Sequence, residues 1–233
     1  MSHIMREDPR RRFVFGFTIE KWRMRLWLAS RSDVLVSYAL DIHKQHHRVV
    51  EFFLRIIFAQ PHQLGWDDTI RRLPSEPQTP PRYDIDVNGK TYRTVRLLSN
   101  VGAEALRGRG TRVWEVRELS QNGEELDMPL VLKDSWVDSD CTREGEVLKN
   151  IRSASNINVK LAVLVDITLL HTHDYGDVQV CGEDDDAHTV IRRGLDLSKY
   201  KQISDFKARE RVVTPTGIAP PPKSRQADLL QYG

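Results

Sequence analysis

The chain has 233 residues, of which 39% are hydrophobic and 29% charged, a composition that supports a buried core and excludes a largely disordered protein. Its 35 Lys and Arg nearly balance 33 Asp and Glu, so the net charge of +2 lacks the dominant basic field of general nucleic-acid and membrane-surface binders. The two cysteines, Cys141 and Cys181, form no CxxC pair, which argues against a disulfide framework and against a thiolate zinc site.

The first sixty residues predict an antiparallel pair of strands followed by a helix. Apolar residues at every second position over 13–19 are typical of a half-buried strand, and 24–30 repeats the alternation. A helix is predicted from Ile42 to Phe58, with Asp41 as its N-cap, and its broad apolar stripe predicts that it is buried in the core. The N-terminus has no apolar signal core and no apolar run approaches the ~20 residues that span a bilayer, so an intracellular protein, cytoplasmic or nuclear, is expected.

Turn residues organise the middle of the chain. Residues 73–82 contain four prolines and predict a linker or an extended surface loop. The Asn-Gly pair at 88–89 predicts a β-hairpin, because type I′ turns need two positions that tolerate positive φ. A second hairpin is predicted over 113–134, with Asn122-Gly123 in its turn. The first hairpin would place Asp84 opposite Arg93, a favourable cross-strand charge pair.

The C-terminal part is predicted to mix helices, strands and loops. The patterns indicate a helix over 140–153, a buried strand over 161–170, a loop over 171–190 and a short strand over 209–213. The acidic run at 183–186 is expected to be solvated. Residues 224–232 are predicted to begin another helix.

Three features between residues 108 and 144 point to nucleotide chemistry. Gly108 and Gly110 lie between strand-like runs, where glycine lets backbone N–H groups approach a polyphosphate. Lys133 ends an apolar strand, and Glu144 follows eleven residues later on the apolar side of the predicted helix. A carboxylate there is costly to bury alone, so it is predicted to pair with Lys133. Glycine loop, strand lysine and helix glutamate, in this order, are the parts of a protein-kinase small lobe.

The sequence resembles the fungal-type protein kinase domain. The resemblance is carried by RRFVFGFTIE, MRLWLASRSDVLVS, GRGTRVWEV, VLKDSW and REGEVL, it is strongest over residues 9–153, and it continues more loosely to Tyr232. It implies an α+β fold in which an antiparallel kinase-type small-lobe sheet with one αC-type helix follows a strand-and-helix extension. The implied divisions are the extension at 9–72, the linker at 73–82, the small lobe and hinge at 83–218, and the start of a large lobe at 219–233.

The resemblance also implies roles for individual residues. Lys133 would be the lysine that contacts the ATP phosphates, and Glu144 its helix partner. Gly108, Gly110 and Thr111 would belong to the loop that covers the phosphates. Val131 would cover the adenine, together with Trp114 or Val116 on the preceding strand. A protein substrate or partner is implied, with no membrane, and the uncovered lobe face predicts self-association.

The sequence departs from the kinase pattern in one major respect. It contains neither His-Arg-Asp with a following Asn nor Asp-Phe-Gly, and Val113 replaces the third glycine of the loop. Phosphoryl transfer needs Mg²⁺ held by acids and an aspartate beside the attacking hydroxyl. This chain alone is therefore expected to be catalytically incompetent, with weak or absent ATP binding, and Mg²⁺ is expected only in a complete kinase.

Other interpretations remain open. The chain could instead be a non-catalytic, pseudokinase-like interaction module. A nucleic-acid binder built on residues 1–60, with eleven Lys and Arg against six acids, ranks lowest. His171, His173, Asp174 and Asp177 could form a metal cluster, but four such residues in a polar loop are more often solvated, and no metal site is predicted.

Overall fold

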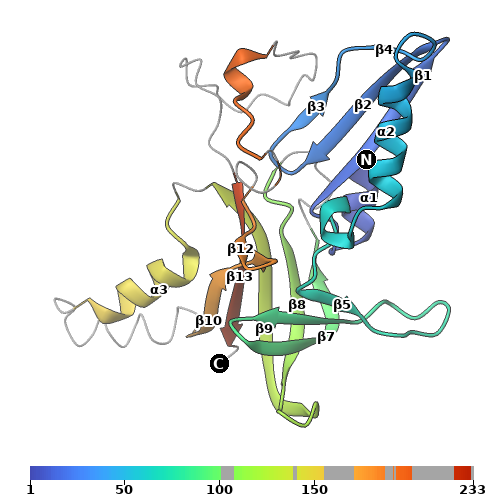
Figure 1. Ribbon diagram of the computed structural model, residues 1–233. Coiled ribbons are helices and arrows are strands. Elements are labelled where there is room, and N and C mark those ends of the chain that lie inside the picture. The colour runs from blue at the N-terminus through green and yellow to red at the C-terminus, as the bar shows by residue number, and fades with distance from the viewer. Residues whose placement is uncertain are drawn as a thin grey trace.

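The computed structural model describes residues 1–100, 108–138, 141–154, 171–186, 191, 193–200 and 223–231, the last segment as backbone only. These residues form an α+β fold whose strands belong to a four-stranded sheet, a seven-stranded sheet and a two-stranded hairpin (Figure 1). None of the described helices is both long and apolar enough to cross a membrane.

The N-terminal sheet confirms the predicted strand pair. After helix α1 (Ser2–Glu7), strands β1 (Phe13–Glu20) and β2 (Arg23–Ser30) pair antiparallel over their full length. Two short strands, β3 (Val34–Val36) and β4 (Leu40–Asp41), both pair with β2. Within β1, only Phe13 and Val14 are buried. The apolar side chains further along the strand are exposed, so the predicted half-buried pattern holds only at its start.

Helix α2 (His46–Ile57) starts later than the sequence predicts. The Asp41 carboxylate does accept hydrogen bonds from the backbone N–H groups of His43 (3.0 Å) and Lys44 (3.1 Å), but these bonds close a turn ahead of the helix. Asp41 therefore caps this turn and not α2.

The prediction that this helix is buried in the core was wrong. The structure describes all of α2, and none of its residues is buried. The Phe53 ring packs edge-on against Phe17 of β1, with ring centroids 5.4 Å apart, whereas Ile57 is 70% exposed. Helix α2 lies along the N-terminal sheet (Figure 1).

The seven-stranded sheet is antiparallel throughout, in the order β10-β13-β9-β8-β7-β6-β5. Its strands are β5 (Ile70–Arg72), β6 (Tyr83–Val87), β7 (Lys90–Ser99), β8 (Arg112–Leu119), β9 (Glu125–Asp138), β10 (His171–Asp177) and β13 (Lys223–Gln231). Residues 73–82 form the loop between the paired strands β5 and β6, so the sheet includes residues on both sides of the proline-rich segment.

Both predicted Asn-Gly hairpins are confirmed. The first turn pairs Val87 with Lys90 and Asp84 with Arg93, whose guanidinium donates hydrogen bonds of 2.8 and 3.0 Å to both carboxylate oxygens. The second connects β8 to β9, with Gly123 at a φ of +80°. These turns bring successive strands side by side.

Two segments in the C-terminal part differ from their predictions. Residues 171–177 form strand β10 where a loop was expected, and residues 223–231 form strand β13 where a helix was expected. Both sequences lack the apolar alternation that indicates a strand, and it is pairing with β9 that places β13 in the sheet. The predicted strands at 161–170 and 209–213, and the hinge after them, lie outside the described residues.

A cluster of buried side chains lies on one face of the curled sheet. Its members are Ile70, Tyr83, Ile85, Val87, Tyr92, Trp114, Val116, Leu130 and Leu132. The sheet curls far enough for the Asn88 amide, at the β6–β7 turn, to donate to Asp174 Oδ1 (2.8 Å) and to the Tyr175 carbonyl (3.0 Å) in β10. Burial raises the pKa of Tyr92 at the centre of this cluster.

A buried ion pair links the N-terminal region to the hairpin of β11 (Gln179–Val180) and β12 (Glu183–Asp184). Arg12 is 1% exposed and Asp185 is fully buried, and the Arg12 Nε donates to Asp185 Oδ1 at 2.9 Å. The prediction that the whole acidic run is solvated was therefore wrong for Asp185. A charge can be buried there because the guanidinium compensates it.

We expect Arg12→Met to lower the free energy of unfolding by about 3–5 kcal/mol, because it leaves the Asp185 carboxylate buried without its cation. Arg55→Met is the matched control. It removes a surface pair with Glu51 (2.7 Å, one helical turn apart) and should cost about 0.5 kcal/mol or less. Chemical denaturation followed by circular dichroism measures both, and equal small losses would contradict a supporting role for the buried pair.

Candidate functional site

Strand β9 presents two different faces. Leu130 and Leu132 point into the buried cluster, so Val131 and Lys133 point to the other side of the sheet. Lys133 lies opposite Val113 on β8 and opposite residue 228 on β13. The lysine is therefore on an inner strand of the sheet, on the face opposite the buried cluster.

Lys133 pairs with Glu144 as predicted. The Lys133 ammonium contacts a carboxylate oxygen of Glu144, the first residue of helix α3 (Glu144–Ser153). The side chains are 21% and 46% exposed, respectively. The prediction that Glu144 lies on a core-facing stripe was wrong, because Glu144 is exposed and Ile151, further along the helix, is exposed as well.

Helix α3 lies beside β10 (Figure 1), and the residues on both sides of Glu144 contact that strand. Arg143 Nε lies 2.8 Å from Asp177 Oδ1. Gly145 is buried, and a Cβ built on it would lie 2.3 Å from Cγ of Tyr175. A charge pair before Glu144 and a close backbone approach after it therefore hold the carboxylate toward Lys133.

The predicted glycine loop contacts the N-terminal region. The Gly108 N–H donates to the Arg31 carbonyl at 3.1 Å, and Gly110 has a φ of +57°. A Cβ on Gly110 would lie 2.8 Å from Nε of Arg31, which is itself buried. Close packing on Arg31 is thus the role that the structure gives these glycines, with half-buried Thr111 following them.

The loop nevertheless enters the sheet beside β9. The Trp136 N–H donates to the Arg109 carbonyl at 2.7 Å, and Arg112 pairs with Asp134. The end of the loop and Lys133 therefore lie near the same end of β8 and β9.

Of the apolar positions named from the sequence, only Val131 shares a face with Lys133. Trp114 and Val116 point the opposite way, into the buried cluster, because β8 alternates like β9. The β8 residues on the lysine side that pair with Lys133 and Val131 are Val113 and Glu115, and Glu115 accepts a hydrogen bond of 2.6 Å from Arg96. We therefore place Val116 in the core and outside the candidate site.

The polar side chains of β10 bind other parts of the chain. His173 lies 3.0 Å from a Glu118 oxygen, while Asp174 accepts from Asn88 and Asp177 pairs with Arg143. Burial raises the pKa of Glu118, but hydrogen bonds from His173 and Lys90 outweigh it, and the net pKa lies below the usual glutamate value. These residues have structural partners in place of the solvent that the sequence predicted.

Comparison with known families shows to which family the chain belongs. A family model described as fungal protein kinase matches residues 1–229. The chain belongs to the fungal protein kinase family. No curated protein and no solved structure matches it. The match includes the N-terminal sheet and α2 as well as the seven-stranded sheet, so the resemblance that the sequence shows is confirmed.

The sequence did not predict that Arg143, Tyr175 and Asp177 help to position Glu144. They were missed because β10 was predicted as a loop, and a polar edge strand shows no alternation. One signal was present. Gly145 lies inside a predicted helix, where glycine costs roughly 1 kcal/mol and usually marks a close approach.

We expect Gly145→Ala to loosen α3 even though alanine favours helix formation, because its Cβ collides with the inner atoms of the Tyr175 ring. Amide hydrogen exchange over residues 144–153 should become faster. Glu146→Ala, at the next and exposed position, is the control and should leave the exchange unchanged. Slower exchange in Gly145→Ala would show that helix propensity, not the contact with β10, controls this end of α3.

Proposed function

We propose that Lys133 binds the phosphates of ATP and that Glu144 orients it. In a complete kinase this site would serve transfer of the ATP γ-phosphoryl group to Ser, Thr or Tyr hydroxyls of proteins. The observation that carries the proposal is the ion pair between the ammonium on β9 and the carboxylate at the start of α3. Family membership supports the kinase-like class of the reaction.

The surroundings of Lys133 suit an anion-binding ammonium. Val131 and Val113 lie on the same face of the sheet, so apolar side chains limit access of water to the charge. The Lys133 side chain is 21% exposed, so its ammonium can reach a ligand. A phosphate there would gain charge-assisted hydrogen bonds from Lys133, while Glu144 restricts the conformations of the long side chain.

The Lys133–Glu144 pair contributes little to the stability of the fold. With Glu144 46% exposed, the pair resembles a surface salt bridge, and such pairs contribute about 0–1 kcal/mol. The chain nevertheless fixes Glu144 from both sides through Arg143 and Gly145. The Glu144 carboxylate is held in place although its ion pair adds little to the stability of the fold. A ligand that binds Lys133 explains this arrangement better than folding does.

We propose nucleotide binding by this chain, without turnover. The 233 residues contain no His-Arg-Asp and no Asp-Phe-Gly, the motifs that supply the base and the Mg²⁺ ligands in kinases. Without those groups the γ-phosphoryl group lacks both an activated acceptor and charge neutralisation. We therefore propose that the chain binds ATP weakly and transfers no phosphoryl group by itself.

A second candidate function is a non-catalytic interaction module. The observation that favours it is the apolar surface of β1 and α2, where Phe17, Ile19, Ile57 and Phe58 are all exposed. Exposed apolar patches of this kind mark protein contacts. The two functions differ in whether the chain binds ATP at Lys133.

We expect Lys133→Met to weaken binding of a fluorescent ATP analogue about tenfold or more, because hydrogen bonds to charged groups are worth about 1.5–3 kcal/mol. Lys90→Met is the matched control. It removes an ammonium paired with Glu118 (3.2 Å) elsewhere on the same sheet and should change affinity by no more than about twofold. Fluorescence titration up to millimolar nucleotide measures both variants.

The same proteins give a stability control. Lys133→Met should change the free energy of unfolding by less than about 1 kcal/mol, because the pair is partly exposed. If the native chain shows no saturable binding, or if Lys133→Met binds as tightly as the native chain, nucleotide binding at this site is refuted and the interaction module is favoured.

A further inference from the structure

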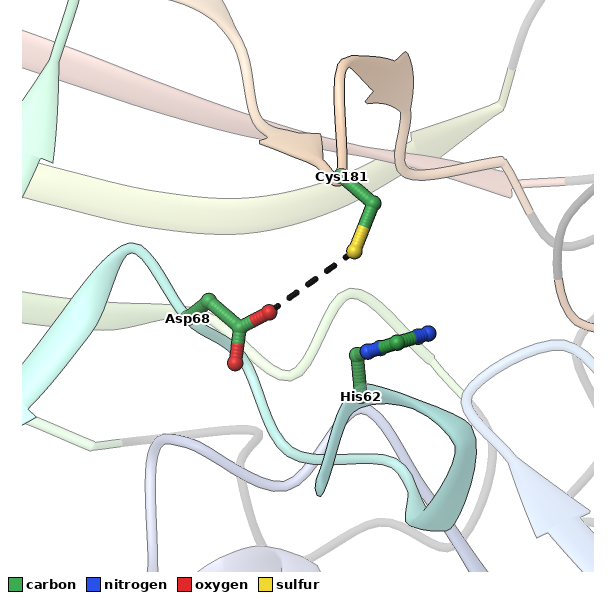
Figure 2. A group of neighbouring side chains, drawn as sticks. All are labelled: His62, Asp68 and Cys181. Carbon is green, nitrogen blue, oxygen red and sulfur yellow. Dashed lines mark hydrogen bonds between the residues drawn. The ribbon is translucent and has the colours of Figure 1, made fainter. Parts of the chain in front are cut away.

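Three side chains from distant parts of the sequence converge beside the β11–β12 turn (Figure 2). His62 comes from the 3₁₀ helix η1 (Pro61–Leu64), Asp68 from the segment just before β5, and Cys181 from the turn itself. One ligand atom from each lies within 4.8 Å of the other two, and Cys181 Sγ lies 3.8 Å from Asp68 Oδ2. The kinase-like site uses none of these residues.

The spacing is close to that of ligands around one small cation. Ligands of a tetrahedral zinc ion, at bond lengths of about 2.0–2.3 Å, lie roughly 3.5 Å from one another. The sulfur–oxygen distance of 3.8 Å already approaches this value, and all three ligand atoms lie within 4.8 Å of one another. His62 is half-buried and the other two side chains are exposed, so an ion could enter from solvent.

The backbone that carries Asp68 and His62 is firmly held. The buried Asp67 carboxylate accepts hydrogen bonds from the Thr69 N–H (2.8 Å) and hydroxyl (2.6 Å). Gly65 ends η1 at a φ of +88°, where a Cβ would lie 2.2 Å from the Phe13 carbonyl oxygen. Both potential ligands therefore belong to a loop that packs against β1.

Cys181 is held in an unusual conformation. It occupies a two-residue turn with φ values of +55° for Cys181 and +81° for Gly182, positions that normally favour Asn, Asp or Gly. Val180 is buried and paired with Glu183 on the other side of the turn. The turn thus points the thiol toward η1 at some conformational cost.

We propose that His62, Asp68 and Cys181 bind one Zn²⁺ ion, with water in the fourth position. A thiolate, an imidazole and a carboxylate form a mixed donor set that suits this borderline ion and disfavours Mg²⁺ and Ca²⁺, which prefer oxygen alone. Within the part of the chain that the structure describes, Asp68 forms no ion pair with Lys or Arg, so its negative charge is available to a cation.

The ion would join segments that lie 113 residues apart in the sequence. It would hold η1 and the start of β5 against the β11–β12 hairpin, the hairpin that Arg12 also anchors through Asp185. Closing so long a loop restricts the unfolded chain more than the folded one. Zinc would therefore stabilise the contact between the N-terminal region and the rest of the fold, independently of ATP.

The test uses the full chain, freed of metal by a chelator and kept reduced. Zn²⁺ titration calorimetry should give one equivalent bound and a higher midpoint of thermal unfolding. Co²⁺, a spectroscopic substitute, should produce a thiolate-to-metal charge-transfer band. Cys181→Ser should abolish this band and weaken Zn²⁺ binding roughly tenfold or more, and His62→Ala and Asp68→Ala should each weaken binding similarly.

Cys141→Ser is the matched control, because Cys141 is the other exposed cysteine and lies outside the cluster. It should leave Zn²⁺ affinity and the Co²⁺ spectrum unchanged. If Cys181→Ser does not fold, the two alanine variants decide the question. A Zn²⁺ affinity that loss of any one of the three ligands leaves unchanged, a Co²⁺ spectrum without a thiolate band, or equal loss in Cys141→Ser would overturn the proposal.

Discussion

The alternation of side chains along β9 is the constraint on which this structure depends. Leu130 and Leu132 complete the buried cluster, and the same pleat directs Val131 and Lys133 to the opposite face. A shift of one residue in the pairing of β9 with β8 would exchange these faces, exposing two leucines and burying an ammonium. The burial of the core therefore also places the lysine.

The glutamate partner depends on different contacts. Glu144 is too exposed for burial to orient it, and its position comes from Arg143 and Gly145, which connect α3 to Asp177 and Tyr175 of β10. Strand β10 reaches β9 only through β13, so three strands and a helix contribute to one ion pair. The Arg12–Asp185 pair is the converse case, fully buried and important mainly for stability.

Local patterns in the sequence correctly predicted the features that depend on residues close together in the chain. The two Asn-Gly hairpins, the β1–β2 pair and the order of glycine loop, strand lysine and helix glutamate all follow from short-range rules. The errors came from long-range packing. Whether α2 is buried, whether 223–231 is a strand, and which carboxylate of the acidic run is buried depend on segments far away in the chain. The His62–Asp68–Cys181 cluster was not predicted for the same reason, because its three residues share no sequence motif.

Chemical labelling can show whether Lys133 lies beside the phosphates of bound ATP. An acyl-phosphate derivative of ATP transfers its acyl group to an amine next to the phosphates, and mass spectrometry then identifies the modified lysine. We expect Lys133 to be acylated and excess ATP to suppress that labelling, while Lys90, paired with Glu118, keeps its background level. Labelling of Lys133 that ATP does not suppress, or suppression at other lysines only, would contradict the account.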